Sequence, residues 1–140
     1  MKFWDASALV PLFVWEPKSS DCHLIAQGDP EIAHWWGTPI EIHSGLERRF
    51  REGGLTATNL ATSRRSLEKL LQSSHEVDPS EQIRISALHL LRLHPLKAAD
   101  ALQLASALHL ISSRGTSIEF VSLDDRLRTA ALAEGATVLP

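Results

Sequence analysis

The chain has 140 residues, of which 44% are apolar and 22% charged, and its formal net charge is −3 at pH 7. These values are close to globular averages, so they exclude a disordered chain and a disulfide-stapled miniprotein and predict one domain, residues 1–140. No stretch reaches the roughly 18 apolar residues of a membrane helix. With one cysteine, Cys22, and with Asp5 interrupting any apolar leader, we expect a cytoplasmic protein without membrane association.

Short apolar segments alternate with helical patterns along the chain. In chain order, the expected elements are a strand at 2–4 leading into a helix after Asp5, a helix at 17–27, a strand at 31–36, helices at 38–52 and 57–73, a polar or briefly extended connection at 75–78, helices at 80–93 and 97–113, a strand at 118–122, a helix at 124–134 and a strand at 136–139. This alternation predicts an α/β fold, with helices packed around a mostly parallel sheet.

The start of the 38–52 helix carries a capping signature. Thr38 is expected at the N-cap, Pro39 at the first helical position and Glu41 at the third, which is the spacing of a capping box. We therefore expect the Thr38 hydroxyl to accept a hydrogen bond from the backbone of the same helix.

Four acidic residues follow predicted strands or begin the helices after them. They are Asp5, Glu41, Asp100 and Asp124. Each alone could simply favour a helix N-terminus through the helix dipole. Ligands of parallel sheets bind beyond the carboxyl ends of the strands, so we expect all four at one sheet edge. Four such carboxylates repel one another unless a cation lies between them, and Mg²⁺ or Mn²⁺ fits because hard cations prefer oxygen ligands. Such a site suits phosphodiester hydrolysis.

Four segments of the chain resemble the PIN-domain family, and most closely the VapC-type toxins of type II toxin–antitoxin systems. The segments are Asp5-Ala6-Ser7-Ala8-Leu9, Thr38-Pro39-Ile40-Glu41 followed by Leu46 and Arg48, Ala99-Asp100-Ala101-Leu102, and Phe120-Val121-Ser122-Leu123-Asp124 with Leu127. They span almost the whole chain, with all four acidic positions in order.

The resemblance implies a three-layer α/β/α sandwich around a sheet of four or five strands. It implies a hydrolase, a Mg²⁺- or Mn²⁺-dependent endoribonuclease, in which the metal-binding and catalytic acids are Asp5, Glu41, Asp100 and Asp124. Ser7 and Ser122 match small polar positions of the first and fourth motifs. The family further implies an RNA substrate, a homodimer and a cognate antitoxin that holds the toxin inactive.

Two positions near these motifs have alternative interpretations. Asp125 adjoins Asp124, and the spacing of Ser122, Asp124 and Leu127 favours Asp124 as the inward carboxylate, with Asp125 at the start of the helix. Arg48 lies two helical turns beyond Glu41 on the same face, where it could contact a substrate phosphate, pair with a site acid or lie in solvent.

The charge is uneven along the sequence. Six basic residues lie between Arg48 and Lys69, with Glu47, Glu52 and Glu68 beside them. This stretch could contact an RNA backbone or an acidic segment of an antitoxin, or it could simply be a solvated helix surface.

Three alternatives to a toxin ribonuclease remain. The first is a PIN nuclease of RNA processing outside a toxin pair, and the second is a non-catalytic PIN-like binding module, which the presence of all four acids disfavours. The third is a receiver-like signalling module that binds Mg²⁺ at strand ends. A receiver needs a paired acid after the first strand and a later lysine, but here Asp5 stands alone and the late strands offer no lysine.

Overall fold

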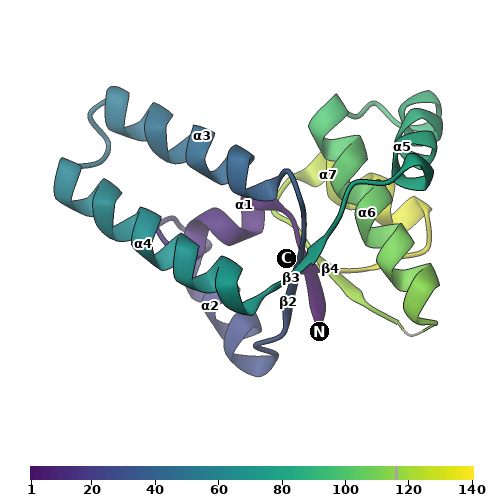
Figure 1. Ribbon diagram of the computed structural model, residues 1–140, viewed down its shortest axis with the longest axis horizontal. Coiled ribbons are helices and arrows are strands. Elements are labelled where there is room, and N and C mark those ends of the chain that lie inside the picture. Colours follow the sequence, from purple (N-terminus) through teal and green to yellow (C-terminus); the bar gives the residue numbers. More distant parts are fainter. Residues whose placement is uncertain (116) are drawn as a thin grey trace.

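A five-stranded, fully parallel sheet forms the centre of the computed structural model, which describes residues 1–115 and 117–140. The strands run in the spatial order β3-β2-β1-β4-β5 (Figure 1). Their bounds are β1 (Lys2–Trp4), β2 (Ile32–Trp35), β3 (His75–Val77), β4 (Glu119–Val121) and β5 (Thr137–Leu139). In chain order the strands run from β1 outward through β2 to β3, and the chain then returns to the other side of β1 for β4 and β5. The sheet therefore has a topological switch point beside β1, and ligands of such folds bind at this point.

Helices cover both faces of the sheet, as Figure 1 shows. One layer contains α1 (Ala6–Leu9), the short 3₁₀ helix η1 (Val10–Leu12), α2 (Ser19–Gly28), α3 (Thr38–Arg51) and α4 (Ala57–Ser73). The other contains α5 (Glu81–Leu93), α6 (Ala98–Arg114) and α7 (Asp125–Ala133). The predicted three-layer α/β/α sandwich with a parallel sheet is therefore confirmed.

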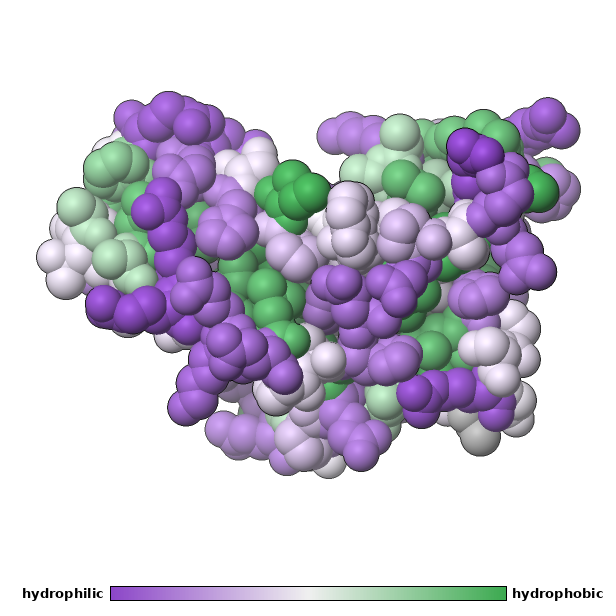
Figure 2. All heavy atoms as spheres, in the orientation of Figure 1, coloured by the Kyte–Doolittle hydropathy of each residue, from purple (hydrophilic) through white to green (hydrophobic). Residues whose placement is uncertain are grey.

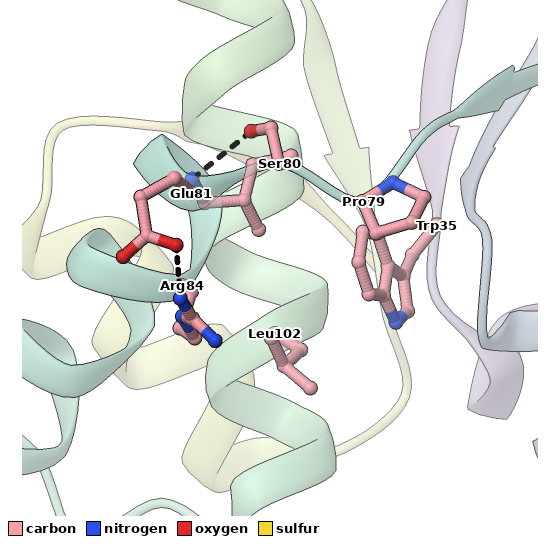
Figure 3. Close-up of a pocket in the computed structure, with 7 residues that line it drawn as sticks. Trp35, Pro79, Ser80, Glu81, Arg84 and Leu102 are labelled. Atoms are coloured by element: carbon pink, nitrogen blue, oxygen red, sulfur yellow. Dashed lines mark hydrogen bonds and ion pairs between the residues drawn. The ribbon is translucent and has the colours of Figure 1, made fainter.

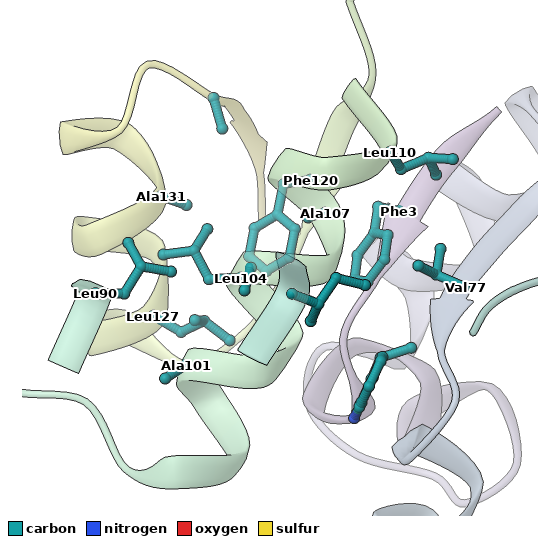
Figure 4. Packing of buried hydrophobic residues seen from close by; sticks show 14 of the residues in the cluster. Phe3, Val77, Leu90, Ala101, Leu104, Ala107, Leu110, Phe120, Leu127 and Ala131 are labelled. Atoms are coloured by element: carbon teal, nitrogen blue, oxygen red, sulfur yellow. The ribbon is translucent and has the colours of Figure 1, made fainter. Parts of the chain in front are cut away.

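The two layers bury separate hydrophobic clusters because successive strand residues point to opposite faces. Phe3 lies under α5–α7, where its ring stacks on that of Phe120 with the centroids 5.8 Å apart (Figure 4). Trp4 points the other way and packs with Leu9 and Ile42 under α1–α4. Phe3 and Trp4 are both fully buried, which fixes the register of β1 and hence the position of Asp5 immediately after it.

The capping prediction for α3 was wrong. Gly37 stands at the N-cap without a side-chain hydrogen bond, Thr38 is the first helical residue, and its hydroxyl donates to Gln103 on α6. A Cβ at residue 37 would lie 2.6 Å from Nε1 of Trp35, so the chain passes the indole closely at this turn. The Thr38 hydroxyl therefore bonds to α6 instead of capping its own helix.

The connection at 75–78 contains a strand. β3 pairs in parallel with β2 at the sheet edge, and its first two residues, His75 and Glu76, are exposed. In the part of the chain that the structure describes, no helix has the length and apolar character needed to cross a membrane.

Candidate active site

The four candidate acids lie on segments at the carboxyl end of the sheet. Asp5 directly follows β1, and its backbone N–H donates to the carbonyl of Val121 at the end of β4, 3.1 Å away. Asp124 is the N-cap of α7, three residues beyond β4. Glu41 lies in the first turn of α3, and Asp100 lies in the first turn of α6. These placements agree with the sequence expectation for each segment.

Asp5 is a carboxylate held in a buried position. Only 5% of the residue is exposed, and its Oδ1 accepts hydrogen bonds from Ser7 Oγ at 2.7 Å and from the backbone N–H of Ala8 at 3.3 Å. Burial nevertheless raises the pKa of Asp5 to about 7, because the lost hydration outweighs the hydrogen bonds that favour the charged form. A nearby positive charge would therefore stabilise the charged form of Asp5.

Ser7 and Ser122 connect Asp5 to the segment that carries Asp124. Ser7 Oγ accepts from the backbone N–H of Leu123 at 2.9 Å and lies 3.5 Å from Ser122 Oγ. Ser122 Oγ in turn accepts from the backbone N–H of Asp124 at 3.1 Å. The hydroxyls of Ser7 and Ser122 therefore connect the segment of Asp5 to the segment of Asp124 by hydrogen bonds.

Glu41 lies within the electrostatic influence of Asp100. Burial raises the pKa of Glu41, a hydrogen bond from Gln103 opposes that rise, and the negative charge of Asp100 adds to it. Asp100 itself accepts a hydrogen bond from the backbone N–H of Lys97 at 3.3 Å, an interaction typical of the start of a helix. Asp100 on α6 therefore lies near enough to Glu41 on α3 for its negative charge to disfavour the charged form of Glu41.

Asp124 and Asp125 occupy different surroundings. Asp124 is half-buried, and its Oδ1 accepts from the backbone N–H of Leu127 at 2.9 Å, so it caps α7. Asp125 is exposed and lines a separate cavity of about 260 Å³ together with His94 and Pro95. Of the two residues, Asp124 is the one whose backbone N–H donates to Ser122 Oγ.

A cleft of about 330 Å³ runs along α3, and Glu41 is the member of the four candidate acids that lines it. Its lining includes Ser7, Glu41, Gly45, Arg48, Arg49 and Glu16. Figure 2 shows the molecular surface notched between the α3 side and the α5–α7 layer. Arg49 is ion-paired with Glu16, whereas Arg48 is exposed and, among the described residues, has no carboxylate partner. Arg48 is thus the cation at this cleft that is free to meet an anionic ligand.

The basic stretch of α3 and α4 is partly neutralised within the fold. Besides the Arg49–Glu16 pair, Arg64 is ion-paired with Glu47 across the two helices. These pairs use two of the six basic residues for internal contacts.

A second cavity, of about 360 Å³, lies between the end of β2, the start of α5 and α6. Trp35, Pro79 and Leu102 form its apolar side, and the Glu81–Arg84 ion pair lies at its rim (Figure 3). Its lining contains none of the four acids, whereas the α3 cleft contains Glu41 and also Ser7, the hydrogen-bond partner of Asp5.

The donor chemistry of the acids fits a hard divalent cation, although the side chains do not converge on one point. Among residues 1–115 and 117–140, no group of three His, Cys, Asp or Glu side chains is close enough to hold a metal ion as it stands. The candidate ligands are nevertheless all carboxylates, as Mg²⁺ and Mn²⁺ prefer. Asp5 and Glu41 both have a pKa raised by burial, and a cation would reverse that effect.

Gln103 contributes to this site but was not a sequence candidate. It is 1% exposed on α6, and its Nε2 donates to Glu41 Oε1 at 2.9 Å. In the sequence it is only a polar interruption of an apolar helix. The one available signal was its spacing three residues after Asp100, which puts the two on neighbouring positions of one helix face.

A parallel sheet between two helical layers, with acidic residues on the segments at its carboxyl end, matches the PIN-like class of α/β proteins. Solved structures agree with this fold. A toxin–antitoxin complex from Klebsiella pneumoniae matches with a TM-score of 0.68 at 19% identity, covering 100% of this chain and 97% of that one. The FitAcB structure from Neisseria gonorrhoeae matches with a TM-score of 0.70 at 13% identity, covering 100% and 97%.

Two curated relatives fix the family. Ribonuclease VapC45 and Ribonuclease VapC49, from two strains of Mycobacterium tuberculosis, are each 33% identical over 139 residues, covering 99% of this chain and 94% of theirs. No family model matches the chain. The chain belongs to the VapC ribonuclease family.

Proposed function

We propose that this protein is a Mg²⁺- or Mn²⁺-dependent endoribonuclease that acts in the cytoplasm as the toxin of a type II toxin–antitoxin pair. The 33% identity to two named VapC ribonucleases over 99% of the chain supports the reaction class. The observation that carries the metal dependence is Asp5, a buried carboxylate whose pKa is raised to about 7, on the same sheet edge as Glu41, Asp100 and Asp124.

The side chains of the candidate active site have different roles in the proposed hydrolysis. Asp5, Glu41, Asp100 and Asp124 would hold the ion. When bound, the ion supplies Lewis-acid polarisation of a phosphoryl oxygen and acidifies a water molecule. Ser7 fixes the Asp5 carboxylate through the 2.7 Å hydrogen bond to Oδ1. Arg48, exposed on the cleft, contacts a phosphate of the RNA backbone, as a guanidinium is suited to do.

Incubation of the purified protein with total RNA tests this proposal. We expect new 5′ ends with Mn²⁺ or Mg²⁺, no cleavage with EDTA, and a loss of at least about a hundredfold in Asp5→Asn. Asp125→Asn is the matched control, because Asp125 is exposed on the separate His94 cavity and should leave the rate within about twofold. Cleavage by Asp5→Asn at the wild-type rate would refute the assignment.

The antitoxin partner is a further part of the proposal. It is supported by the fold shared with the Klebsiella pneumoniae toxin–antitoxin complex. Induced expression of the wild-type protein should arrest growth, and expression of Asp5→Asn should not. Cleavage without growth arrest would favour a processing nuclease outside a toxin pair, and binding of RNA without cleavage would favour a non-catalytic module.

A homodimer is the expected assembly. Helix α5 supports it because Ile85 is 59% exposed, Leu88 55% and Leu91 39%, and these residues follow one another at three-residue spacing along the helix. An apolar row of this kind is typical of a surface that a second copy covers. Sedimentation equilibrium of the wild type and of Leu88→Glu tests it, with dissociation expected in the variant. Equal masses for both would argue against α5 as the interface.

A further inference from the structure

Gln103 joins two helices beside the candidate active site through a buried chain of hydrogen bonds. Its Nε2 donates to Glu41 Oε1 at 2.9 Å, and its Oε1 accepts from Thr38 Oγ1 at 3.1 Å. Gln103 is 1% exposed and Thr38 is fully buried, so neither side chain has ready access to water as a substitute partner. Both atoms of the amide are therefore committed to the first turn of α3.

The chemistry of the neighbours fixes which way the amide points. In the opposite orientation, the amide oxygen would face the carboxylate of Glu41, and two acceptors would meet at hydrogen-bonding distance. With the orientation fixed by Glu41, the Thr38 hydroxyl donates to the amide oxygen and anchors the other atom of the amide. Thr38 thereby acts on Glu41 through Gln103, which explains why its hydroxyl does not cap α3.

We propose that Gln103 is a positioning residue that holds the Glu41 carboxylate for the divalent ion, an inference that rests on the function proposed above. The bond occupies Oε1, and among the described residues no other group hydrogen-bonds to the Glu41 carboxylate, so Oε2 is left for the ion. A neutral donor suits this task because it leaves the negative charge of the site intact. A buried lysine or arginine at residue 103 would instead supply the positive charge that the ion brings.

Helix α6 then serves the site twice. Asp100 lies in its first turn as a candidate ligand, and Gln103, three residues further on, donates to the carboxylate of Glu41. The first two turns of α6 thus carry one candidate ligand and the group that orients another. Partners that orient metal-ligating side chains typically change metal affinity by about 10- to 100-fold when they are removed.

The test is Mn²⁺ binding to the full chain by calorimetry, without RNA. Gln103→Met keeps the side-chain length and removes the hydrogen bonds, and we expect it to weaken Mn²⁺ binding by about tenfold. Thr38→Val removes only the hydroxyl that anchors the amide oxygen, and we expect a smaller loss of the same kind. Ser106→Ala is the matched control, a fully buried polar residue of α6 whose hydroxyl donates to the Leu102 carbonyl, and it should bind Mn²⁺ like the wild type.

A double variant separates positioning from a general loss of stability. If Gln103 acts through Glu41, then Glu41→Gln combined with Gln103→Met should bind Mn²⁺ no more weakly than Glu41→Gln alone. Additive losses, or wild-type affinity in Gln103→Met, would overturn the inference. Absence of Mn²⁺ binding in the wild type would overturn the proposed metal dependence itself, and the inference with it.

A measurement on the wild-type protein covers the case in which Gln103→Met does not fold. The side-chain amide resonance of Gln103 should shift in a ¹⁵N NMR titration with Mg²⁺, and the shift should saturate at the Mg²⁺ concentrations at which calorimetry shows Mg²⁺ binding to saturate. A resonance that stays in place while Mg²⁺ binds would contradict the proposed role.

Discussion

The hydroxyl of Ser7 lies 3.5 Å from that of Ser122, although the two residues are 115 positions apart in the sequence. Ser7 belongs to the helix that follows β1, and Ser122 belongs to the segment that follows β4. Because β1 and β4 are neighbours in the sheet, this contact brings the first and fourth acidic motifs to the same edge. Ser7 also donates a hydrogen bond to the buried carboxylate of Asp5. One small side chain therefore joins the segments after β1 and β4 and also orients a candidate ligand.

Replacing Ser7 by alanine tests this relationship. Ser7→Ala removes a hydrogen bond to Asp5 and leaves the backbone N–H of Leu123 without its acceptor, so we expect a loss of about 1–3 kcal/mol in the free energy of unfolding. We also expect a fall of about tenfold in RNA cleavage, because Asp5 is no longer held. Denaturant titration and initial rates measure the two effects.

The control for Ser7→Ala is Ser73→Ala, which removes an exposed hydroxyl bonded to backbone carbonyls at the end of α4. It should change the free energy of unfolding by no more than about 0.5 kcal/mol. A Ser7→Ala protein as stable and as active as the control would contradict the role assigned to this residue.

The raised pKa of Asp5 predicts a pH dependence of stability in the metal-free protein. Burial moves the pKa from 3.8 to about 7, so between these values the folded chain keeps a proton that the unfolded chain has released. The stabilising contribution is fully present below about pH 4 and is lost as the pH rises through 7. Asp5→Asn, which cannot ionise, should therefore gain stability relative to the wild type across this range, by up to a few kcal/mol.

Denaturant titration in EDTA at pH 5 and pH 8 measures that difference. Added Mn²⁺ should restore stability at pH 8 in the wild type and not in Asp5→Asn, because the ion binds only where the carboxylate is present. A wild-type–variant difference that does not change between the two pH values would show that Asp5 titrates normally.

The exposed guanidinium of Arg48 is predicted to contact the RNA backbone. Arg48→Ala should weaken RNA binding across unrelated sequences and reduce the slope of log affinity against log salt concentration by about one, while Mn²⁺ affinity stays unchanged. Arg51→Ala is the matched control, because Arg51 is an exposed residue of the same helix that does not line the cleft. Equal effects of the two substitutions would indicate general electrostatics and not a cleft contact.

The turn before α3 makes a prediction about glycine. A Cβ at Gly37 would lie 2.6 Å from Nε1 of Trp35, and Trp35 is only 7% exposed, so Gly37→Ala should cost about 1–3 kcal/mol as the indole is displaced. Gly45 lies within α3, and a Cβ there meets no atom within 4 Å. Gly45→Ala should therefore raise the free energy of unfolding by about 0.5–1 kcal/mol. Thermal unfolding of both variants checks the contrast, and a stabilised Gly37→Ala would contradict it.

Much of the fold could be predicted because the signals are local. Helix α4 has the expected bounds of 57–73, and α3 ends within one residue of the expected position, before Gly53. Phe3 and Trp4 sit on opposite faces of β1, as the alternation of a strand requires. β3 was left open in the sequence because only three residues pair, and two of them are polar and exposed at the sheet edge.

The parts that escaped prediction depend on contacts between distant segments. The Thr38 hydroxyl was expected to cap its own helix, yet it bonds to Gln103, 65 residues away. No local pattern distinguishes that contact from a cap, and none marks Gln103 as a partner of Glu41. Likewise, the sequence places all four acids near one edge, but how far each side chain reaches into the cleft is set by tertiary packing.

The central claim is that Asp5, Glu41, Asp100 and Asp124 together bind a divalent cation, and diffraction from crystals grown with Mn²⁺ tests it most directly. Data collected at the manganese absorption edge should give an anomalous peak among these four carboxylates, with side chains moved inward to reach it, and no peak in crystals of Asp5→Asn. The account would be contradicted if the protein cleaves RNA but its crystals show no manganese peak at this edge of the sheet, or show the peak elsewhere in the protein.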